Sequence, residues 1–471
     1  MFLEFPGLGG MLASMRSLAA SKGQPMSMPR ISRFFLLPMI LLALGGGCHH
    51  SSNPNAPGTP PSITLQPVDT STVSGRPVTF TITATGAAVI SYQWAKVQLD
   101  GTGKIISSID ILGALSPSYT FYSPQSADAG RYAVTVTNDI GTVTSYAAAL
   151  TVVPTPEFNA AVGVAFDAAG NLYVSDRDDH VIWKVSSTKQ VTLLAGTQGI
   201  AGSSDGQGSG ASFRNPGCLA FDPTSATLVV ADTGNHTIRR VAADGTVTTL
   251  AGAAGVPGTT DGGAAQARFN APYGIALDAS GRIYIADSRN HTIRFMALDG
   301  TVSTYAGSAG LPGYLDGAAG NARFSEPNGL ALASSGVLYV ADFGNSCIRA
   351  ISPNPNALVS TLAGLAGTVG YADATGKAAL FNQPVGISLD ASGNIWVADT
   401  YNHAIRSITP AGVVHVIAGS GTAGNIDGSG NAALFNYPCG ITSSASGNLL
   451  VADTYNHILR VVTPAGTVTT L

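Results

Sequence analysis

Charged side chains are scarce in this chain of 471 residues, and Glu and Lys are the scarcest of them. Charged residues make up 11% of the sequence, with only 3 Glu and 6 Lys beside 24 Asp and 17 Arg. Glu and Lys are common on helix surfaces, whereas Asp is favoured in turns and caps. Together with 57 Gly and 26 Pro, this imbalance excludes a mainly helical protein or a coiled coil and predicts a turn-rich, all-β chain.

The sequence also lacks a run of Lys and Arg, and its formal net charge is −4. Nucleic-acid-binding domains usually carry a basic patch or stripe. We therefore expect no nucleic-acid partner.

The amino-terminal region has no apolar run long enough to span a membrane. The uncharged stretch at residues 34–47 has 14 residues, whereas a spanning helix needs about 20. Arg30 and Arg33 precede this stretch, an arrangement typical of a signal peptide. The stretch ends at Leu44-Gly45-Gly46-Gly47-Cys48, which resembles the cleavage box of bacterial lipoproteins. This resemblance implies that Cys48 is lipidated; a plain secretory signal followed by an unrelated Cys is the alternative.

These features predict how the first 61 residues are organised. Residues 1–47 form a signal peptide with an over-long leader, so that Met26 or Met28 is the true start. Residues 48–61 are rich in Ser, Pro, Asn and Gly and form a flexible tether. We expect the protein in the bacterial cell envelope, with a lipid anchor as its only membrane contact, or outside the cell.

Residues 62–153 predict a small β-sandwich, because short runs rich in β-branched residues alternate with turn residues. The segment Ala127-Asp128-Ala129-Gly130-Arg131-Tyr132 resembles the tyrosine corner of immunoglobulin-like domains. This resemblance implies that Ile82 and Val134 replace the family's disulfide around Trp94. We expect the domain to act as a spacer, with adhesion as the alternative.

The rest of the chain consists of one repeated unit. Equivalent positions recur at spacings of 55, 56, 55, 57 and 54 residues: Gly163, Cys218, Gly274, Gly329, Gly386 and Gly440. Each unit has four short apolar runs joined by Asp-, Asn- and Gly-rich turns, which is the size of one propeller blade. The segment Asp232-Thr-Gly-Asn-His-Thr-Ile-Arg239 and its sister copies resemble the NHL repeat. The fold class implied is all-β, an immunoglobulin-like sandwich followed by a six-bladed NHL-type β-propeller at residues 157–471.

The last predicted strand, at residues 466–471, leaves the closure of the ring open. We expect the sixth repeat to pack against the first. An exchanged strand would require residues 154–160 to add an edge strand. A longer natural chain is a further alternative.

The repeats carry Asp, Asn and His in one turn, except that Asp179 replaces the Asn in the first and Ser346 replaces the His in the fourth. This pattern raises the question of a metal site. The Asp is present in all six copies: Asp176, Asp232, Asp287, Asp342, Asp399 and Asp453. Residues related by sixfold repetition are spread around a ring, whereas zinc needs three or four ligands at one point. We therefore expect the Asp and Asn side chains to hydrogen-bond the turn backbone, and we expect no metal and no cofactor. The repeated Arg is expected to pair with nearby Asp.

The long loop between repeats carries a second element, which runs from Asp205 to Phe213 in its first copy. One carboxylate per copy is too few for calcium, which takes about six to eight oxygen ligands. We expect a folded loop whose Phe packs between repeats. Cys218, Cys347 and Cys439 each interrupt the repeat pattern, and we expect them to be isolated, buried thiols.

Strand parity predicts where a ligand would bind. Four antiparallel strands per repeat place the turn between the second and third strands on the same face as the long inter-repeat loop. Ligands commonly bind to such loops on a rigid scaffold. The candidate ligand-binding residues break the repetition beside the Pro of each innermost strand: Asn215, Tyr273, Glu326, Asn328, Gln383 and Tyr437. Ordinary sequence drift at a solvated rim is the alternative.

Two functions fit these features. The first is a non-catalytic binding protein, anchored in the cell envelope or secreted, whose propeller face recognises a protein or glycan ligand. The alternative is a metal-dependent lactonase or lyase, because propellers similar to this one include such enzymes. The sequence contains no nucleophile elbow, HExxH motif, phosphate-binding loop or CxxC pair. We therefore expect no catalytic residue and favour binding.

Overall fold

The computed structural model describes residues 58–73, 77–87, 90–122, 124, 126–153, 158–353 and 357–471. The helical segments in these ranges are short 3₁₀ turns, and the regular structure is otherwise β-strand. Within the same ranges, no helix has the length and apolar character needed to cross a membrane. The predicted signal peptide, Cys48 and most of the tether lie outside the described residues.

The amino-terminal unit is built from ten strands. Its main sheet has the order β2-β10-β8-β5-β6, with β9 paired to β8, and two short pairs, β1-β4 and β3-β7, complete it. The strands are β1 (Ser62–Leu65), β2 (Thr70–Val73), β3 (Val78–Thr81), β4 (Thr83–Thr85), β5 (Ser91–Leu99), β6 (Ile105–Asp110), β7 (Ser118–Phe121), β8 (Gly130–Asn138), β9 (Gly141–Thr144) and β10 (Ala148–Val153).

The core of this unit forms around Trp94, whose side chain is fully buried. Ile82 and Val134 belong to the same apolar cluster, in the places where the predicted fold would otherwise have a disulfide. The hydroxyl of Tyr132 donates a hydrogen bond of 2.5 Å to the carbonyl of Asp128. This bond back to the preceding backbone is the defining contact of a tyrosine corner.

Between residues 161 and 470 the chain forms six antiparallel sheets of four or five strands, called here blades one to six in chain order. The innermost strands are β11 (Ala161–Phe166), β16 (Leu219–Asp222), β20 (Pro272–Leu277), β25 (Pro327–Leu332), β29 (Ile387–Leu389) and β34 (Pro438–Ser443). The second strands are β12 (Leu172–Asp176), β17 (Thr227–Asp232), β21 (Ile283–Asp287), β26 (Leu338–Asp342), β30 (Ile395–Asp399) and β35 (Leu449–Asp453).

The outer half of each blade holds the third and fourth strands. The third strands are β13 (Val181–Val185), β18 (Thr237–Val241), β22 (Thr292–Met296), β27 (Cys347–Ile351), β31 (Ala404–Ile408) and β36 (Ile458–Val462). The fourth strands are β14 (Val191–Ala195), β19 (Thr246–Gly252), β23 (Val302–Gly307), β28 (Leu358–Ala363), β32 (Val414–Ala418) and β37 (Thr467–Thr470). Three blades gain a short fifth strand from the inter-blade loop: β15 (Gly206–Gln207), β24 (Gly317–Ala318) and β33 (Gly428–Ser429).

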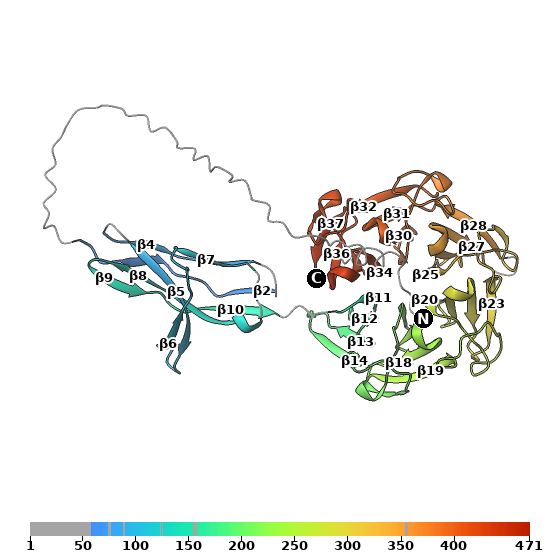
Figure 1. Ribbon diagram of the computed structural model, residues 1–471, viewed down its shortest axis with the longest axis horizontal. Coiled ribbons are helices and arrows are strands. Elements are labelled where there is room, and N and C mark those ends of the chain that lie inside the picture. The colour runs from blue at the N-terminus through green and yellow to red at the C-terminus, as the bar shows by residue number, and fades with distance from the viewer. Residues whose placement is uncertain are drawn as a thin grey trace, which may run out of the picture.

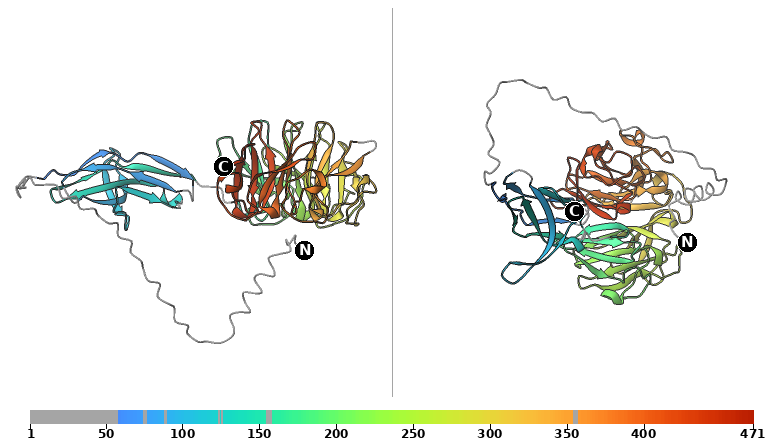
Figure 2. Two further views of the ribbon diagram at one scale, coloured as in Figure 1. Left: turned by 90° about the horizontal axis from the view of Figure 1, so that it is seen from above. Right: turned by 60° about the vertical axis from the view of Figure 1, so that its left-hand side comes forward.

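The six blades stand around a common centre, with the innermost strands lining it (Figure 1). Seen from the side, the ring is a disc with long loops on one face (Figure 2). Each innermost strand neighbours that of the next blade, and β11 of blade one neighbours β34 of blade six. The prediction of an all-β chain with an immunoglobulin-like sandwich followed by a propeller is thus confirmed, whereas the exact domain limits stay predictions.

The repeated glycine of the innermost strands permits close approach of neighbouring blades. A Cβ on Gly329 would collide with the carbonyl oxygen of Val385, and one on Gly386 would collide with that of Cys439. The backbone N–H of Gly329 donates to the same Val385 carbonyl at 2.9 Å. Glycine is therefore required here for spacing rather than for an unusual φ.

The ring closes by packing between blade six and blade one. Phe158, Leu450, Leu459 and residues of β11 share one buried cluster at this junction, and the Thr454 hydroxyl donates to the Ala161 carbonyl at 2.7 Å. Both blades are built from consecutive strands, with no exchanged strand in the described residues. This arrangement agrees with the expectation from the repeat.

Candidate functional site

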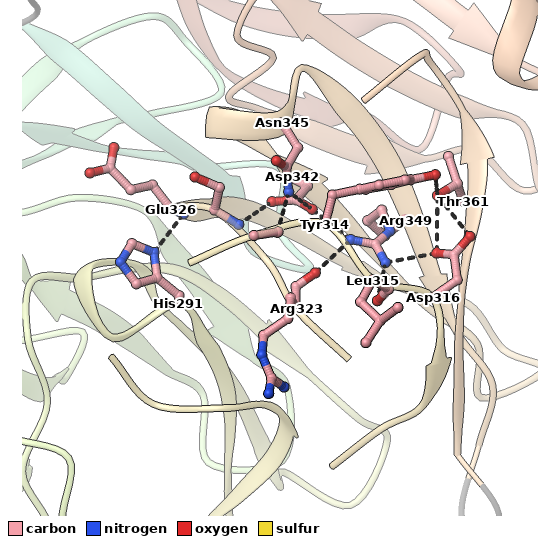
Figure 3. A network of polar contacts seen from close by, with 12 residues as sticks. His291, Tyr314, Leu315, Asp316, Arg323, Glu326, Asp342, Asn345, Arg349 and Thr361 are labelled. Carbon is pink, nitrogen blue, oxygen red and sulfur yellow. Dashed lines mark hydrogen bonds and ion pairs between the residues drawn. The ribbon is translucent and has the colours of Figure 1, made fainter. Parts of the chain in front are cut away.

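The repeated Asp, Asn and Arg side chains bind one another and the backbone of their own blade. In blade four, Arg349 donates to Asp342 at 2.7 Å and to Asp316 of the preceding loop at 2.7 Å. Asn345 also donates to Asp342, at 2.9 Å, and the backbone N–H of Ser325 donates to the second Asp342 oxygen at 2.8 Å. Figure 3 shows this network. The Asp–Arg–Asp arrangement recurs at four further arginines, Arg239, Arg294, Arg406 and Arg460.

The inner Asp of each network is almost inaccessible to water. Burial raises the pKa of Asp232, Asp287, Asp342, Asp399 and Asp453 to about 6, while the paired Arg and the N–H donors favour the charged form. These groups are therefore ionised at neutral pH, each facing a buried guanidinium. The predicted structural role and the predicted Asp–Arg pairing agree with these contacts. The backbone that Asp342 and Asn345 bind, however, belongs to the inter-blade loop, at Ser325 and Gly313, and not to the turn itself.

The Phe of each inter-blade loop packs beneath the same guanidinium. Phe324 is fully buried, and its ring centre lies 5.1 Å from the Arg349 guanidinium. Phe158 takes the equivalent place before blade one, where Trp183 replaces the Arg, and the two rings meet edge to face at 6.5 Å. The loop pattern that ends at Phe213 predicts the equivalent Phe of four further loops, Phe269, Phe324, Phe381 and Phe435, but not Phe158, because the Asp-containing element that marks those loops is absent before it.

The histidines of the repeated turn connect each blade to the next. His291 has a φ of 58°, which aims its ring at blade four, and its Nδ1 accepts the backbone N–H of Glu326 at 3.0 Å. The same bond joins His180, His236 and His403 to the following blade at 3.0–3.2 Å. In blade four, Ser346 replaces the His, and its hydroxyl accepts the N–H of Gln383 at 3.2 Å. The repeated His therefore has a structural role that the sequence analysis did not foresee.

The centre of the ring is blocked near the loop face, the face that carries the second-to-third strand turns and the inter-blade loops. Val162, Tyr273, Phe343, Val385 and Cys439 form a buried apolar cluster there. Cys218, Cys347 and Cys439 are free thiols. Cys347 and Cys439 are buried as predicted, whereas Cys218 is only partly buried and packs against the cluster that contains Cys439, so these two are not isolated from each other. A ligand that approaches the loop face would therefore contact this apolar cluster and not an open central channel.

A cleft of about 290 Å³ opens beside this apolar cluster, between blades one, two and three. The second-to-third strand turns contribute Arg177, Asp178, His236 and Arg289, and the inter-blade loop contributes Arg214 and Asn215. Tyr273 of β20 forms part of the wall. The turns and the loop thus meet on one face, as strand parity predicts.

Two of the six candidate ligand-binding residues, Asn215 and Tyr273, line this cleft. Asn215 donates from its side chain to the Arg177 carbonyl at 3.2 Å. Tyr273 is buried, and burial raises the pKa of its hydroxyl well above the usual value. Both side chains are held in place before any ligand arrives.

The other four candidate ligand-binding residues lie elsewhere on the loop face. The backbone of Glu326 is held by His291, and its carboxylate points away from the Arg349 network (Figure 3). The Ser288 hydroxyl lies 3.2 Å from the Asn328 side-chain oxygen. Gln383 is bound through its backbone, and the ring of Tyr437 contacts Tyr401 and Tyr455 edge to face. The structure does not bring these four together with Asn215 and Tyr273 in the cleft.

The arginines of the cleft are the residues that sequence reasoning missed. Arg177, Arg214 and Arg289 occupy three non-equivalent positions in three repeats, so they form no run along the chain. Arg177 pairs with Asp178 at 2.7 Å, and Asp178 is the only carboxylate among the residues that line the cleft. The available signal was that each of the three arginines departs from the residues at its equivalent positions in the other repeats.

Metal-ligating side chains do not gather in the described ranges, where no three His, Cys, Asp or Glu residues form a group that could hold an ion. The five repeated Asp–Arg pairs are spread around the ring, with one pair in each of blades two to six.

Three segments, residues 269–294, 324–351 and 381–406, match the family model of the NHL repeat. The chain carries NHL repeats. Each matched segment begins at or next to the buried loop Phe and ends at or just after the buried Arg of one blade. A second family model, of the immunoglobulin domain, matches residues 60–138.

Curated relatives share the repeat region. NHL repeat-containing protein 2 from Homo sapiens is 30% identical over 326 residues, which cover 62% of this chain and 44% of that protein. Protein SUPPRESSOR OF QUENCHING 1, chloroplastic, from Arabidopsis thaliana is 30% identical over 318 residues, covering 64% of this chain and 30% of that protein. The chain thus spans less than half the length of either relative.

A solved structure shares the fold over most of the chain. An auxiliary nutrient binding protein from Bacteroides ovatus ATCC 8483 superposes with a TM-score of 0.50 at 16% identity, covering 89% of this chain and 99% of that one.

Proposed function

We propose that this protein is a non-catalytic binding protein whose propeller recognises a glycan or protein ligand on the loop face, with the immunoglobulin-like domain as a spacer. The observation that carries the proposal is the cleft of about 290 Å³. Its size is close to the lower end of the range for small-molecule sites, about 300–1,000 Å³. Its arginines and Asn215 break the repeat, whereas the repeated Asp, Asn and Arg side chains are bound within the blades.

Two side chains make this proposal testable, because they occupy equivalent positions in different blades. Asn215 and Gln383 both precede the Pro of an innermost strand, but only Asn215 lines the cleft. Purified protein would be screened against cell-envelope glycans and extracellular proteins by surface plasmon resonance. We expect Asn215→Ala to weaken capture of the ligand and Gln383→Ala to leave it unchanged. If the two substitutions weakened capture equally, or if neither weakened it, the cleft would not be the ligand-binding site.

The alternative function is a metal-dependent lactonase or lyase. The amount of metal bound per protein and the conversion of the ligand to product distinguish it from a binding protein. The protein as purified would be analysed for bound metal, and its ligand would be followed by NMR for new products. A binding protein returns the ligand unchanged. One equivalent of a divalent metal together with product formation would favour the enzyme.

We further propose that the protein is exported and held at the bacterial cell envelope by a lipid on Cys48. Cells expressing the full chain would be fed a labelled fatty acid and fractionated. We expect label on the wild type and none on Cys48→Ala, which should leave the membrane fraction. A wild type without label would support the secretory alternative.

A further inference from the structure

We propose that the cleft between blades one, two and three binds the acidic group of a polysaccharide, a carboxylate or sulfate ester carried on a sugar ring. This inference rests on the proposed function and names the chemical class of its ligand. It is carried by the convergence of Arg177, Arg214 and Arg289 on one cleft, which Asn215 and Tyr273 also line.

The positive charge of the cleft exceeds its negative charge. Three guanidinium groups line it, and Asp178, paired with Arg177, is the only carboxylate among its lining residues. Arg214 is exposed. The charges of Arg289 and Arg214, after burial itself, also lower the pKa of His236 in the same wall. Like charges that converge in a cleft are stabilised by an anion, and the planar fork of Arg fits carboxylate and sulfate oxygens in pairs.

The cleft is assembled before a ligand binds. Arg177 is largely buried and hydrogen-bonded to Asp178 and to the hydroxyl of Tyr455. Arg289 is half-buried on the turn that follows β21. A guanidinium held in position loses less freedom on binding than one on a loose surface chain.

The remaining walls fit a sugar ring better than an inorganic ion. Tyr273, although largely buried, forms part of the wall of the cleft, and Tyr455 lies beyond Arg177 with Tyr437 against it. Aromatic side chains offer a flat apolar surface with a polar tip. The cleft also holds Asn215 and Asp178, which add an amide and a carboxylate suited to sugar hydroxyls.

Nucleic acid is disfavoured by the same residues. Binding to nucleic acid relies on many phosphate contacts from a basic surface. Here the three arginines stand next to Asp178 on a chain of net charge −4. A single acidic group per ligand unit therefore fits the charge available.

The test compares four polymers on the full exported protein by isothermal titration calorimetry. Polygalacturonate supplies carboxylates, κ-carrageenan supplies sulfate esters, galactan is uncharged, and poly(U) supplies phosphates. We expect at least one of the two acidic polysaccharides to bind at least about tenfold tighter than galactan, because a hydrogen-bonded charge contributes about that factor or more. Added salt should weaken this binding.

Single substitutions then place the acidic group in the cleft. Arg214→Ala and Arg289→Ala should each weaken binding of the acidic polysaccharide about tenfold. Arg282→Ala is the matched control, because Arg282 is half-exposed, is paired with Asp278, and lies on the turn between β20 and β21, at the opposite face from the cleft. Unchanged melting temperatures would show that all three variants fold.

The possible results separate the inference from the function on which it rests. Recognition of an acidic group would be wrong if galactan bound as tightly as the acidic polymers. It would also be wrong if Arg214→Ala and Arg289→Ala left binding of the acidic polymers unchanged. In both cases a glycan-binding loop face would remain. If poly(U) bound more tightly than the acidic polysaccharides, and through the same arginines, the proposal of a polysaccharide ligand would be wrong. No binding of any polysaccharide would overturn both this inference and the glycan form of the proposed function.

Discussion

At the scale of single residues, the same kind of ion pair has very different surroundings within one blade. Arg294 and Asp287 pair at 2.8 Å with side chains that are 1% and 0% exposed. Arg282 and Asp278 pair at 2.5 Å, but the Arg side chain is 48% exposed. A charge left alone in the interior is costly, whereas one left alone in water is not.

We therefore expect Arg294→Met to lower the free energy of unfolding by about 3–5 kcal/mol, because it strands Asp287 in the core. Arg282→Met should cost at most about 1 kcal/mol. Chemical denaturation followed by tryptophan fluorescence measures both. Similar losses for the two variants would contradict the structural role assigned to the buried network.

The blade-to-blade histidines predict a pH dependence of stability. His403 accepts the N–H of Tyr437 through Nδ1 at 3.1 Å, and burial lowers its pKa. The unfolded chain therefore takes up a proton at a pH where the folded chain does not. The stability linked to this His is complete above its ordinary pKa of about 6.5 and is lost as the pH falls below that value.

We expect His403→Ser to reduce stability at pH ~7.5 and to matter progressively less toward pH ~5. Serine is the natural replacement at this position in blade four, where Ser346 accepts the equivalent N–H. Ser346→Ala is the control, since it removes an acceptor that does not titrate, and its cost should not vary with pH. Melting temperatures across this pH range distinguish the two patterns.

At the scale of elements, close packing of the innermost strands predicts a strict requirement for glycine. A Cβ on Gly386 would collide with the Cys439 carbonyl, whereas Gly320 has nothing within 4 Å and an ordinary φ. We expect Gly386→Ala to destabilise the propeller by about 1–3 kcal/mol or more through overpacking. Gly320→Ala should be neutral or slightly stabilising. Calorimetry would measure both, and a harmless Gly386→Ala would show that blades can separate without cost.

The elements were predictable from the sequence because each blade makes the same contacts. The Asp of the turn recurs since in every blade it accepts a backbone N–H of the segment before the innermost strand, as Asp342 does from Ser325 of the inter-blade loop, and the loop Phe recurs since every junction must be filled. The cleft was not predictable in this way. Arg177 and Arg289 sit at different positions of their turns and Arg214 sits in a loop, so only the curvature of the ring brings them together. The blade-to-blade bond of His291 was missed for a related reason, since its partner is the backbone of Glu326 and not a side chain.

At the scale of the whole molecule, stability depends on the junction between blade six and blade one. The other junctions are joined by a continuous chain, whereas this one holds only through packing and bonds such as that from Thr454 to Ala161. Phe158 is 2% exposed and fills this junction, and Phe381 is 0% exposed and fills the one between blades four and five. The two rings are thus equivalent in burial and differ in the covalent continuity around them.

We expect Phe158→Ala and Phe381→Ala each to cost about 3–5 kcal/mol if the six blades unfold as one cooperative unit. In that case, differential scanning calorimetry of either variant shows one propeller transition at a lower temperature. If the closing junction opens alone, Phe158→Ala instead gives early exchange of amide hydrogens confined to blades one and six. Because the cleft is built partly from blade one, through Arg177 and Asp178, that second outcome would also weaken ligand binding, whereas Phe381→Ala, in a distant blade, would leave the affinity of the folded protein intact.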